Sequence, residues 1–232
     1  MTAEKQFQMV MRDMLFLTWE VAPEVVRKLV DQRLELDTVE GSNGRAAALV
    51  SAVCFRVAEV RSSILLLPSL SFDQVNYRVY VKAGDVPAVS FLDIKVNSRM
   101  VAAITGFMSV PVHYEDIDIK TLSGDAGVSR YTVKSAGVRA EVTIGAQDAT
   151  DGRITPEFIT ARLVGYVGVG DAVFRIEVEQ PGLQTVLAHV QNVSAPTLEK
   201  LGVLTPVQSA RPYSALYVRE ALFGASTPTR LS

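Results

Sequence analysis

The segment Val75–Lys82 alternates between two kinds of side chain, and this period of two restricts it to a β-strand with one buried face. One face carries Val75, Tyr77, Val79 and Val81, and the other carries Asn76, Arg78, Tyr80 and Lys82. The turn Ala83-Gly84-Asp85 leads into Pro87–Val96, a second segment of strand length. We therefore predict an antiparallel hairpin of Val75–Lys82 and Pro87–Val96, with the Val75 face buried.

Further segments of strand length occur through most of the chain, whereas helical patterns are confined to four short segments. The predicted helices cover Pro23–Leu34, Ser98–Phe107, Pro156–Leu163 and Pro196–Leu201. The other predicted strands cover Met14–Trp19, Arg45–Val60, Ile117–Leu122, Val128–Ser135, Val138–Gly145, Val164–Val169, Ala172–Val178, Leu183–Val190 and Ser214–Leu222. Many hairpin-linked strands with few helices indicate an α+β fold built on a large, mainly antiparallel sheet or barrel. We expect one domain over residues 1–223 and a disordered tail over 224–232.

Composition argues against several classes of function. Lysine plus arginine number 23 and aspartate plus glutamate 25, so the net charge is −2 and nucleic acid is not expected as a partner. Cys54 is the only cysteine and the histidines are His113 and His189, so we expect no disulfide framework, metal site or cofactor. No apolar run reaches the roughly 20 residues of a membrane-spanning helix. Residues 1–13 carry no secretory signal pattern, and we expect a cytoplasmic protein with no membrane contact.

Several blocks of sequence carry a family resemblance. Residues 12–37 read RDMLFLTWEVAPEVVRKLVDQRLELD, and they resemble the opening of the acetoacetate decarboxylase-like superfamily. Within that superfamily the chain is most similar to the uncharacterised bacterial YqjF-type domain, over roughly residues 11–220. The matching residues are Leu15-Phe16-Leu17, Trp19, Pro23-Glu24, Asn76, Arg78, Tyr80-Val81, Ser98-Arg99, residues 158–162 (FITAR) and residues 177–180 (EVEQ).

The resemblance implies a cone-like barrel of antiparallel strands around a buried pocket. In the decarboxylases, a lysine in this pocket forms a Schiff base with a β-keto acid. A second lysine beside it lowers the pKa of the first, which keeps the amine neutral and nucleophilic. We also expect this chain to form a homo-oligomer.

The chain departs from the decarboxylase pattern at the catalytic lysine pair. No lysine occurs between Val96 and Ile119. One alignment places Ser109 and Val110 at the pair, and another places Val112 and His113 there. The pocket glutamate of the family maps near Gln74, while the family arginine is retained as Arg12. We therefore expect no Schiff-base decarboxylation, and the resemblance assigns no catalytic residue.

The candidates for binding a carboxylate are Arg12, Arg78 and Arg99, because a guanidinium with free donors forms a bidentate clamp. The alternative is that each pairs with a structural acid such as Asp37, Glu59 or Asp93. His113 is a candidate general base or hydrogen-bonding group, or else a surface loop residue. The predicted ligand-binding residues are Arg12, Gln74, Asn76, Arg78, Arg99, Ser109 and His113.

The function that these features favour is the binding of a small organic acid in a central pocket, without the Schiff-base lysine. One alternative is a lyase, hydratase or isomerase that acts on a carbonyl acid by other chemistry. Another is a structural or regulatory oligomer whose pocket is filled by Phe72, Tyr77 or Met108. A hollow pocket with polar groups in its wall favours binding or catalysis, whereas a plugged one favours the structural role.

Overall fold

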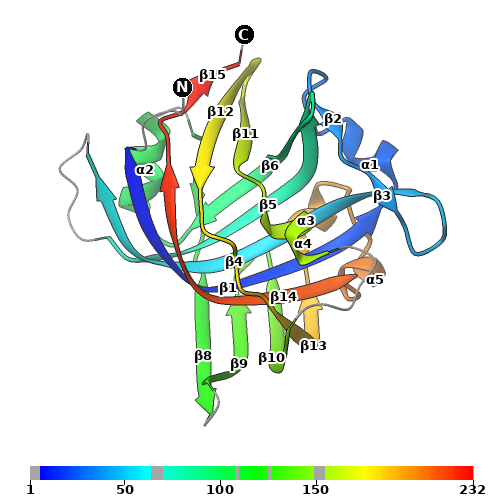
Figure 1. The fold of residues 1–232 in the computed structure, drawn as a ribbon, viewed down its shortest axis with the longest axis vertical. Coiled ribbons are helices and arrows are strands. Elements are labelled where there is room, and N and C mark those ends of the chain that lie inside the picture. The colour runs from blue at the N-terminus through cyan, green and yellow to red at the C-terminus, as the bar shows by residue number, and fades with distance from the viewer. Residues whose placement is uncertain (1–5, 64–69, 108–109, 125–126, 149–154, 232) are drawn as a thin grey trace.

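The computed structural model describes residues 6–63, 70–107, 110–124, 127–148 and 155–231, and they form a fold dominated by one large mixed sheet (Figure 1). The strands are β1 (Phe7–Val21), β2 (Glu35–Leu36), β3 (Val39–Glu40), β4 (Ala46–Ser62), β5 (Phe72–Ala83), β6 (Val86–Val96), β7 (Val112–Tyr114), β8 (Asp118–Gly124), β9 (Gly127–Lys134), β10 (Arg139–Asp148), β11 (Val164–Val169), β12 (Ala172–Glu179), β13 (Val186–Ser194), β14 (Ser214–Ala225) and β15 (Thr229–Arg230). The helices are α1 (Pro23–Arg27), α2 (Arg99–Phe107), α3 (Pro156–Thr160), α4 (Pro196–Lys200) and α5 (Pro206–Ser209). Among the described residues, no helix is long and apolar enough to cross a membrane.

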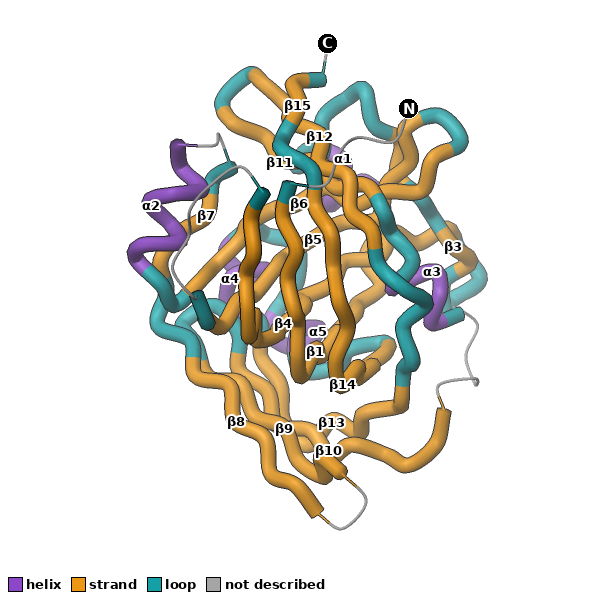
Figure 2. The backbone as a smooth tube through the Cα atoms, turned by 60° about the vertical axis from the view of Figure 1, so that its left-hand side comes forward, coloured by secondary structure: helices purple, strands orange, loops and turns teal. Residues whose placement is uncertain are grey.

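The sheet curls around an interior. Its strand order is β15-β12-β11-β6-β5-β4-β1-β14-β13-β10-β9-β8, and β12 also pairs with β14 through Val178 and Ala225. The second pairing joins β12 and β14, which are the first and last strands of the run β12-β11-β6-β5-β4-β1-β14. Strands β8, β9, β10 and β13 extend away from this run (Figures 1 and 2). Most neighbours are antiparallel, as predicted, but β6 pairs in parallel with both β7 and β11.

The predicted hairpin of β5 and β6 is confirmed. The two strands pair antiparallel, with Val81 opposite Ala88. The predicted apolar face is fully buried and belongs to a core shared with β9, β10 and α4. The opposite face of β5 points to a second core inside the curled sheet, with Phe16, Phe55 and Tyr80. Both faces of the hairpin are therefore covered, which the alternation did not indicate.

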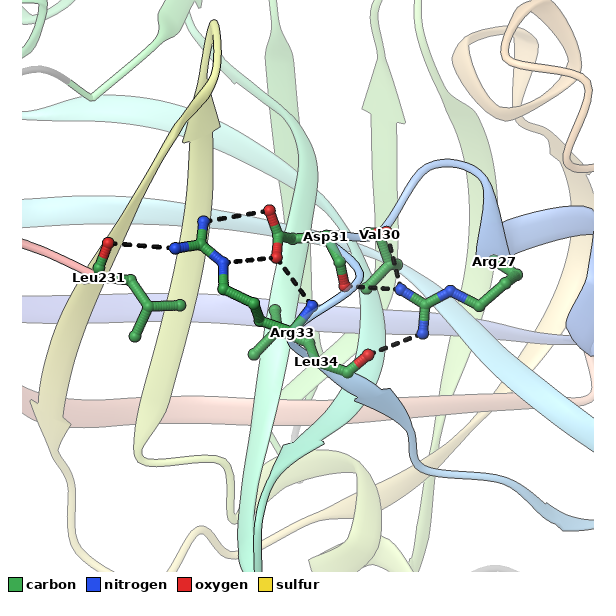
Figure 3. A network of polar contacts seen from close by, with 6 residues as sticks. All are labelled: Arg27, Val30, Asp31, Arg33, Leu34 and Leu231. Atoms are coloured by element: carbon green, nitrogen blue, oxygen red, sulfur yellow. Dashed lines mark hydrogen bonds and ion pairs between the residues drawn. The ribbon is translucent and has the colours of Figure 1, made fainter.

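The first predicted helix is shorter than expected. The apolar periodicity predicted Pro23–Leu34, but α1 ends at Arg27. The Arg27 guanidinium explains the difference, because it donates hydrogen bonds to the carbonyl oxygens of Val30, Asp31 and Leu34 at 2.8, 2.6 and 2.7 Å (Figure 3). The guanidinium thus binds carbonyls of the turns that follow α1, where the Leu34 N–H also donates to the Asp31 carbonyl oxygen.

The end of the chain differs most from the prediction. We expected a disordered tail from residue 224, but β14 continues to Ala225. Thr229–Arg230 then adds β15 to β12, with Phe174 opposite Arg230. Backbone pairing with β12 therefore orders this segment, although its small and polar side chains did not indicate a strand. Helix α3 also ends earlier than predicted, at Thr160, and β2, β3, β7 and α5 were not predicted.

Candidate functional site

A cavity of about 260 Å³ lies against the inner face of the curled sheet. Its wall is almost entirely apolar, with side chains from β1, β5, β6, α2 and β12, among them Met11, Phe72, Phe91, Val101 and Ile176. Two larger hollows, of about 670 and 730 Å³, lie along β13 and β9–β10, and charged and amide side chains contribute to their walls. The interior cavity is the better candidate site, because it is lined by apolar side chains around a few polar groups.

Two amide side chains from β5 are among the polar groups of the wall, together with the hydroxyls of Thr105 and Ser226. Gln74 and Asn76 both line the cavity, and Gln74 Nε2 donates a hydrogen bond of 2.6 Å to Asn76 Oδ1. In this arrangement Gln74 Oε1 remains a hydrogen-bond acceptor and Asn76 Nδ2 remains a hydrogen-bond donor. No lysine, arginine, histidine, aspartate or glutamate is among the described residues that line the cavity.

Arg78 is the next residue on the same face of β5, two positions beyond Asn76. Its Nη2 donates to the carbonyl oxygen of Ile159 at 2.8 Å and to the Tyr80 hydroxyl at 3.2 Å. The guanidinium lies over the rings of Phe16 and Tyr80, 5.4 and 5.3 Å from their centroids. Within the described part of the chain, its buried Nε has no hydrogen-bond partner and no carboxylate pairs with it.

A buried chain of hydroxyls holds Tyr80 beside Arg78. The Tyr80 hydroxyl lies 2.8 Å from Ser51 Oγ, which lies 2.7 Å from Thr18 Oγ1. Ser51 and Thr18 occupy facing positions on β4 and β1 and are completely buried. Each hydroxyl in this chain therefore has a partner, and the ring that stacks on Arg78 is fixed by the strands behind it.

Arg12 is not brought to the cavity, although the resemblance placed it there. Its Nε pairs with Glu220 Oε2 at 2.5 Å, and its side chain is 54% exposed. The reason is the alternation along β1: Met9 and Met11 line the cavity, so Arg12 faces outward. At Asp13, which has a φ of 52°, the strand is irregular, and beyond it Met14 and Phe16 take up the inner face.

The remaining predicted residues also lie away from the cavity or cannot be placed. Arg99 is exposed and stacks on the Tyr114 ring at 4.2 Å. His113 is exposed, with Nδ1 2.9 Å from Asp93 Oδ1, because its neighbour Val112 takes the inward position on β7. Ser109 and Met108 lie outside the described residues, whereas Val110 lines the cavity. Of the predicted residues, Gln74 and Asn76 line the cavity and contact each other, and Arg78 follows them on the same face of β5 without lining the cavity.

Among the described residues that line the cavity, Thr105 and Ser226 carry hydroxyl groups, and none is a lysine or a cysteine. Lys82 pairs with Asp37 at 3.0 Å and Lys95 with Asp93 at 3.0 Å, both away from the lining residues. Complete burial raises the pKa of the Cys54 thiol, so this cysteine is held protonated and unreactive. No group of three histidine, cysteine, aspartate or glutamate side chains among the described residues is arranged to hold a metal ion.

Comparison with other proteins places the chain in a family. The DUF2071 family, described as an uncharacterised conserved protein, matches residues 8–219. The uncharacterised protein YqjF of Bacillus subtilis (strain 168) is 31% identical over 117 residues, which are 49% of this chain and 46% of YqjF. The match thus spans less than half of the length of this curated relative.

Solved structures of low sequence identity share the fold. The enduracididine biosynthesis enzyme MppR with HEPES bound has a TM-score of 0.65 at 13% identity, over 100% of this chain and 89% of MppR. An acetoacetate decarboxylase-like enzyme of Sphingomonas wittichii RW1 has a TM-score of 0.64 at 13% identity, over 99% and 94% of the two chains. Acetoacetate decarboxylase of Legionella pneumophila has a TM-score of 0.62 at 10% identity, over 98% and 87%. The fold is therefore acetoacetate decarboxylase-like, and the chain belongs to the DUF2071 family.

Proposed function

We propose that the protein binds a small organic acid, with the apolar part in the cavity and the carboxylate extending to Arg78, which lies two positions beyond the lining residue Asn76 on β5. The observation that carries this proposal is a half-buried cation on the inner face of β5, with a buried Nε that has no hydrogen-bond partner and with no carboxylate partner among the described residues. An unpaired charge away from water is costly. A ligand carboxylate relieves that cost, because it accepts from the free donors of the guanidinium.

The neighbouring groups support this assignment. Gln74 and Asn76 lie between the apolar wall and Arg78 along β5, and their amides offer hydrogen bonds to a polar substituent of the acid. MppR, whose fold is similar, has been solved in complex with pyruvate. Pyruvate is a small organic acid, so a site for such a ligand is compatible with this fold.

The two alternative functions have less support. A filled pocket is disfavoured because Phe72 lines the cavity rather than closing it, and Tyr77 faces the other core. A lyase, hydratase or isomerase needs an acid or base within reach of its substrate. No described residue of the lining carries such a side chain. We therefore favour ligand binding over catalysis, and Schiff-base chemistry is not part of the proposal.

Isothermal titration of the purified protein with hexanoate and with hexanol tests the proposal. We expect hexanoate to bind, and Arg78→Met to weaken it by about 1.5–3 kcal/mol, the scale of hydrogen bonds to a charged group. Hexanol lacks the charge, so its weaker binding should change little. Arg12→Met is the matched control, because this arginine lies outside the cavity.

Arg78→Lys shows whether positive charge alone suffices, and it keeps the experiment informative if Arg78→Met unfolds. Circular dichroism melting curves identify such unfolding. The role of Arg78 would be contradicted if the unaltered protein bound hexanoate and hexanol equally and if Arg78→Lys bound hexanoate as tightly as the unaltered protein. Absence of binding by either compound would contradict the ligand site itself.

A further inference from the structure

Gly165 is the second residue of β11, and its missing side chain leaves room that another residue uses. It is buried between two strands, opposite Val89 of β6 and Ile176 of β12. The glycines with positive φ are Gly44, Gly84, Gly170 and Gly202, so the backbone at Gly165 does not require glycine. A glycine inside a strand often marks a close approach by another group.

The group that approaches Gly165 is the ring of Phe91. A Cβ atom at Gly165 would lie 2.6 Å from Phe91 Cε2 and 3.4 Å from Phe91 Cζ. No other side chain is among the three nearest contacts of that position. The ring therefore lies directly against the bare backbone of β11, and any side chain at Gly165 must displace it. Both residues line the interior cavity.

Phe91 also borders Arg78. The two residues are directly opposite on β6 and β5, immediately after the irregularity in that pairing at Tyr77 and Arg78. Side chains opposite each other on antiparallel strands lie on the same face and in contact range. Phe91 thus lines the apolar cavity and is the cross-strand neighbour of Arg78.

We propose that the contact between Phe91 and Gly165 sets the width of the ligand that reaches Arg78. The inference rests on the proposed function and adds the shape of the acid: a ring that rests on Gly165 leaves space for a broad acyl group. When β11 carries a side chain at position 165, the ring moves off the backbone into the cavity. The site then accepts a straight chain and rejects a branched or aromatic one.

The test compares a narrow acid with a broad one, hexanoate with 3-phenylpropanoate, by isothermal titration. Gly165→Ala should weaken 3-phenylpropanoate about tenfold relative to hexanoate, a loss typical of one added methyl group in an apolar pocket. Gly168→Ala is the matched control, since Gly168 lies on the same strand with nothing within 4 Å of its Cβ position. The ratio of its affinities for 3-phenylpropanoate and hexanoate should equal the ratio in the unaltered protein.

Phe91→Leu keeps the test informative if Gly165→Ala folds poorly, because leucine is apolar and lacks the ring edge that meets position 165. We expect the double variant Gly165→Ala/Phe91→Leu to regain the binding of 3-phenylpropanoate. An unchanged affinity ratio in Gly165→Ala would overturn the proposal while leaving the ligand site intact. So would a crystal structure of that variant with the Phe91 ring unmoved. If neither acid binds the unaltered protein, the proposed function fails together with this inference.

Discussion

Arg162 and Asp37 form a buried ion pair, with Arg162 Nη1 2.6 Å from Asp37 Oδ2 and side chains that are only 3% and 6% exposed. Arg162 follows α3, and its guanidinium also stacks on the Phe158 ring at 4.1 Å. Ile159 of the same helix accepts the hydrogen bond from Arg78. The ion pair therefore fixes the short helix that holds Arg78 in place.

We predict that Asp37→Asn destabilises the protein by about 3 kcal/mol, because it leaves the Arg162 guanidinium buried without a counter-charge. Lys82, which also pairs with Asp37, is 44% exposed and remains solvated. Urea unfolding followed by fluorescence measures the change. Asp118→Asn is the control, since Asp118 pairs with Lys120 at the surface and its loss should cost less than about 1 kcal/mol. Equal midpoints for the two variants would contradict this role of Asp37.

Arg27 is predicted to stabilise the segment after α1 through its three carbonyl hydrogen bonds (Figure 3). Arg27→Lys should lower the free energy of unfolding by about 1.5–3 kcal/mol, because an ammonium group cannot reach several carbonyls as the planar guanidinium does. Arg61→Lys is the control, since Arg61 is 73% exposed and pairs with Glu59 in its own strand. A denaturation midpoint of Arg27→Lys that equals the control's would argue against the prediction.

The segment that Arg27 binds shows a limit of prediction from sequence. The spacing of Val26, Leu29, Val30 and Leu34 is that of a helix, and all four do pack in or against the first core. Burial of these positions was therefore predictable, but their backbone was not. Beyond Arg27 the backbone forms short turns, and the Arg27 side chain binds three of their carbonyls. Periodicity carries no information about such contacts.

The site was predictable in part, for a similar reason. The period of two placed Asn76 and Arg78 on one face of β5, the resemblance added Gln74, and the structure has all three on that face, with Gln74 hydrogen-bonded to Asn76. The sequence could not show that this polar face also lines an interior, because that depends on the pairing that curls the sheet. The irregularity at Asp13 likewise reverses which residues of β1 face inward, and it moves Arg12 outside. Phe91 and Gly165 were missed because their contact joins β6 to β11.

Gly137 is predicted to be required by packing. A Cβ atom there would overlap the Tyr77 hydroxyl and lie 2.5 Å from Thr197 Oγ1. Gly137→Ala should therefore destabilise the protein by about 1–3 kcal/mol, as overpacking of a core does. Tyr77→Phe removes the overlapping hydroxyl, so the double variant should lose less than the sum of the single variants. Thermal melts measure these effects, with Gly182→Ala, which has nothing within 4 Å of its Cβ position, as the control. Additive losses would show that the two residues do not clash.

Borohydride reduction in the presence of acetoacetate is predicted to leave no specific adduct on the protein. A Schiff base requires a neutral amine beside the bound carbonyl, and desolvation or a neighbouring cation usually supplies that state. Lys82 and Lys95 are instead paired with carboxylates, which stabilise the charged amine, and no described lining residue is a lysine. Mass spectrometry of the intact protein measures the adduct, and peptide mapping separates slow alkylation of surface amines from reaction at one site. The matched control omits acetoacetate. A stoichiometric adduct confined to a single lysine would contradict the prediction and would assign to this chain the chemistry of the decarboxylases.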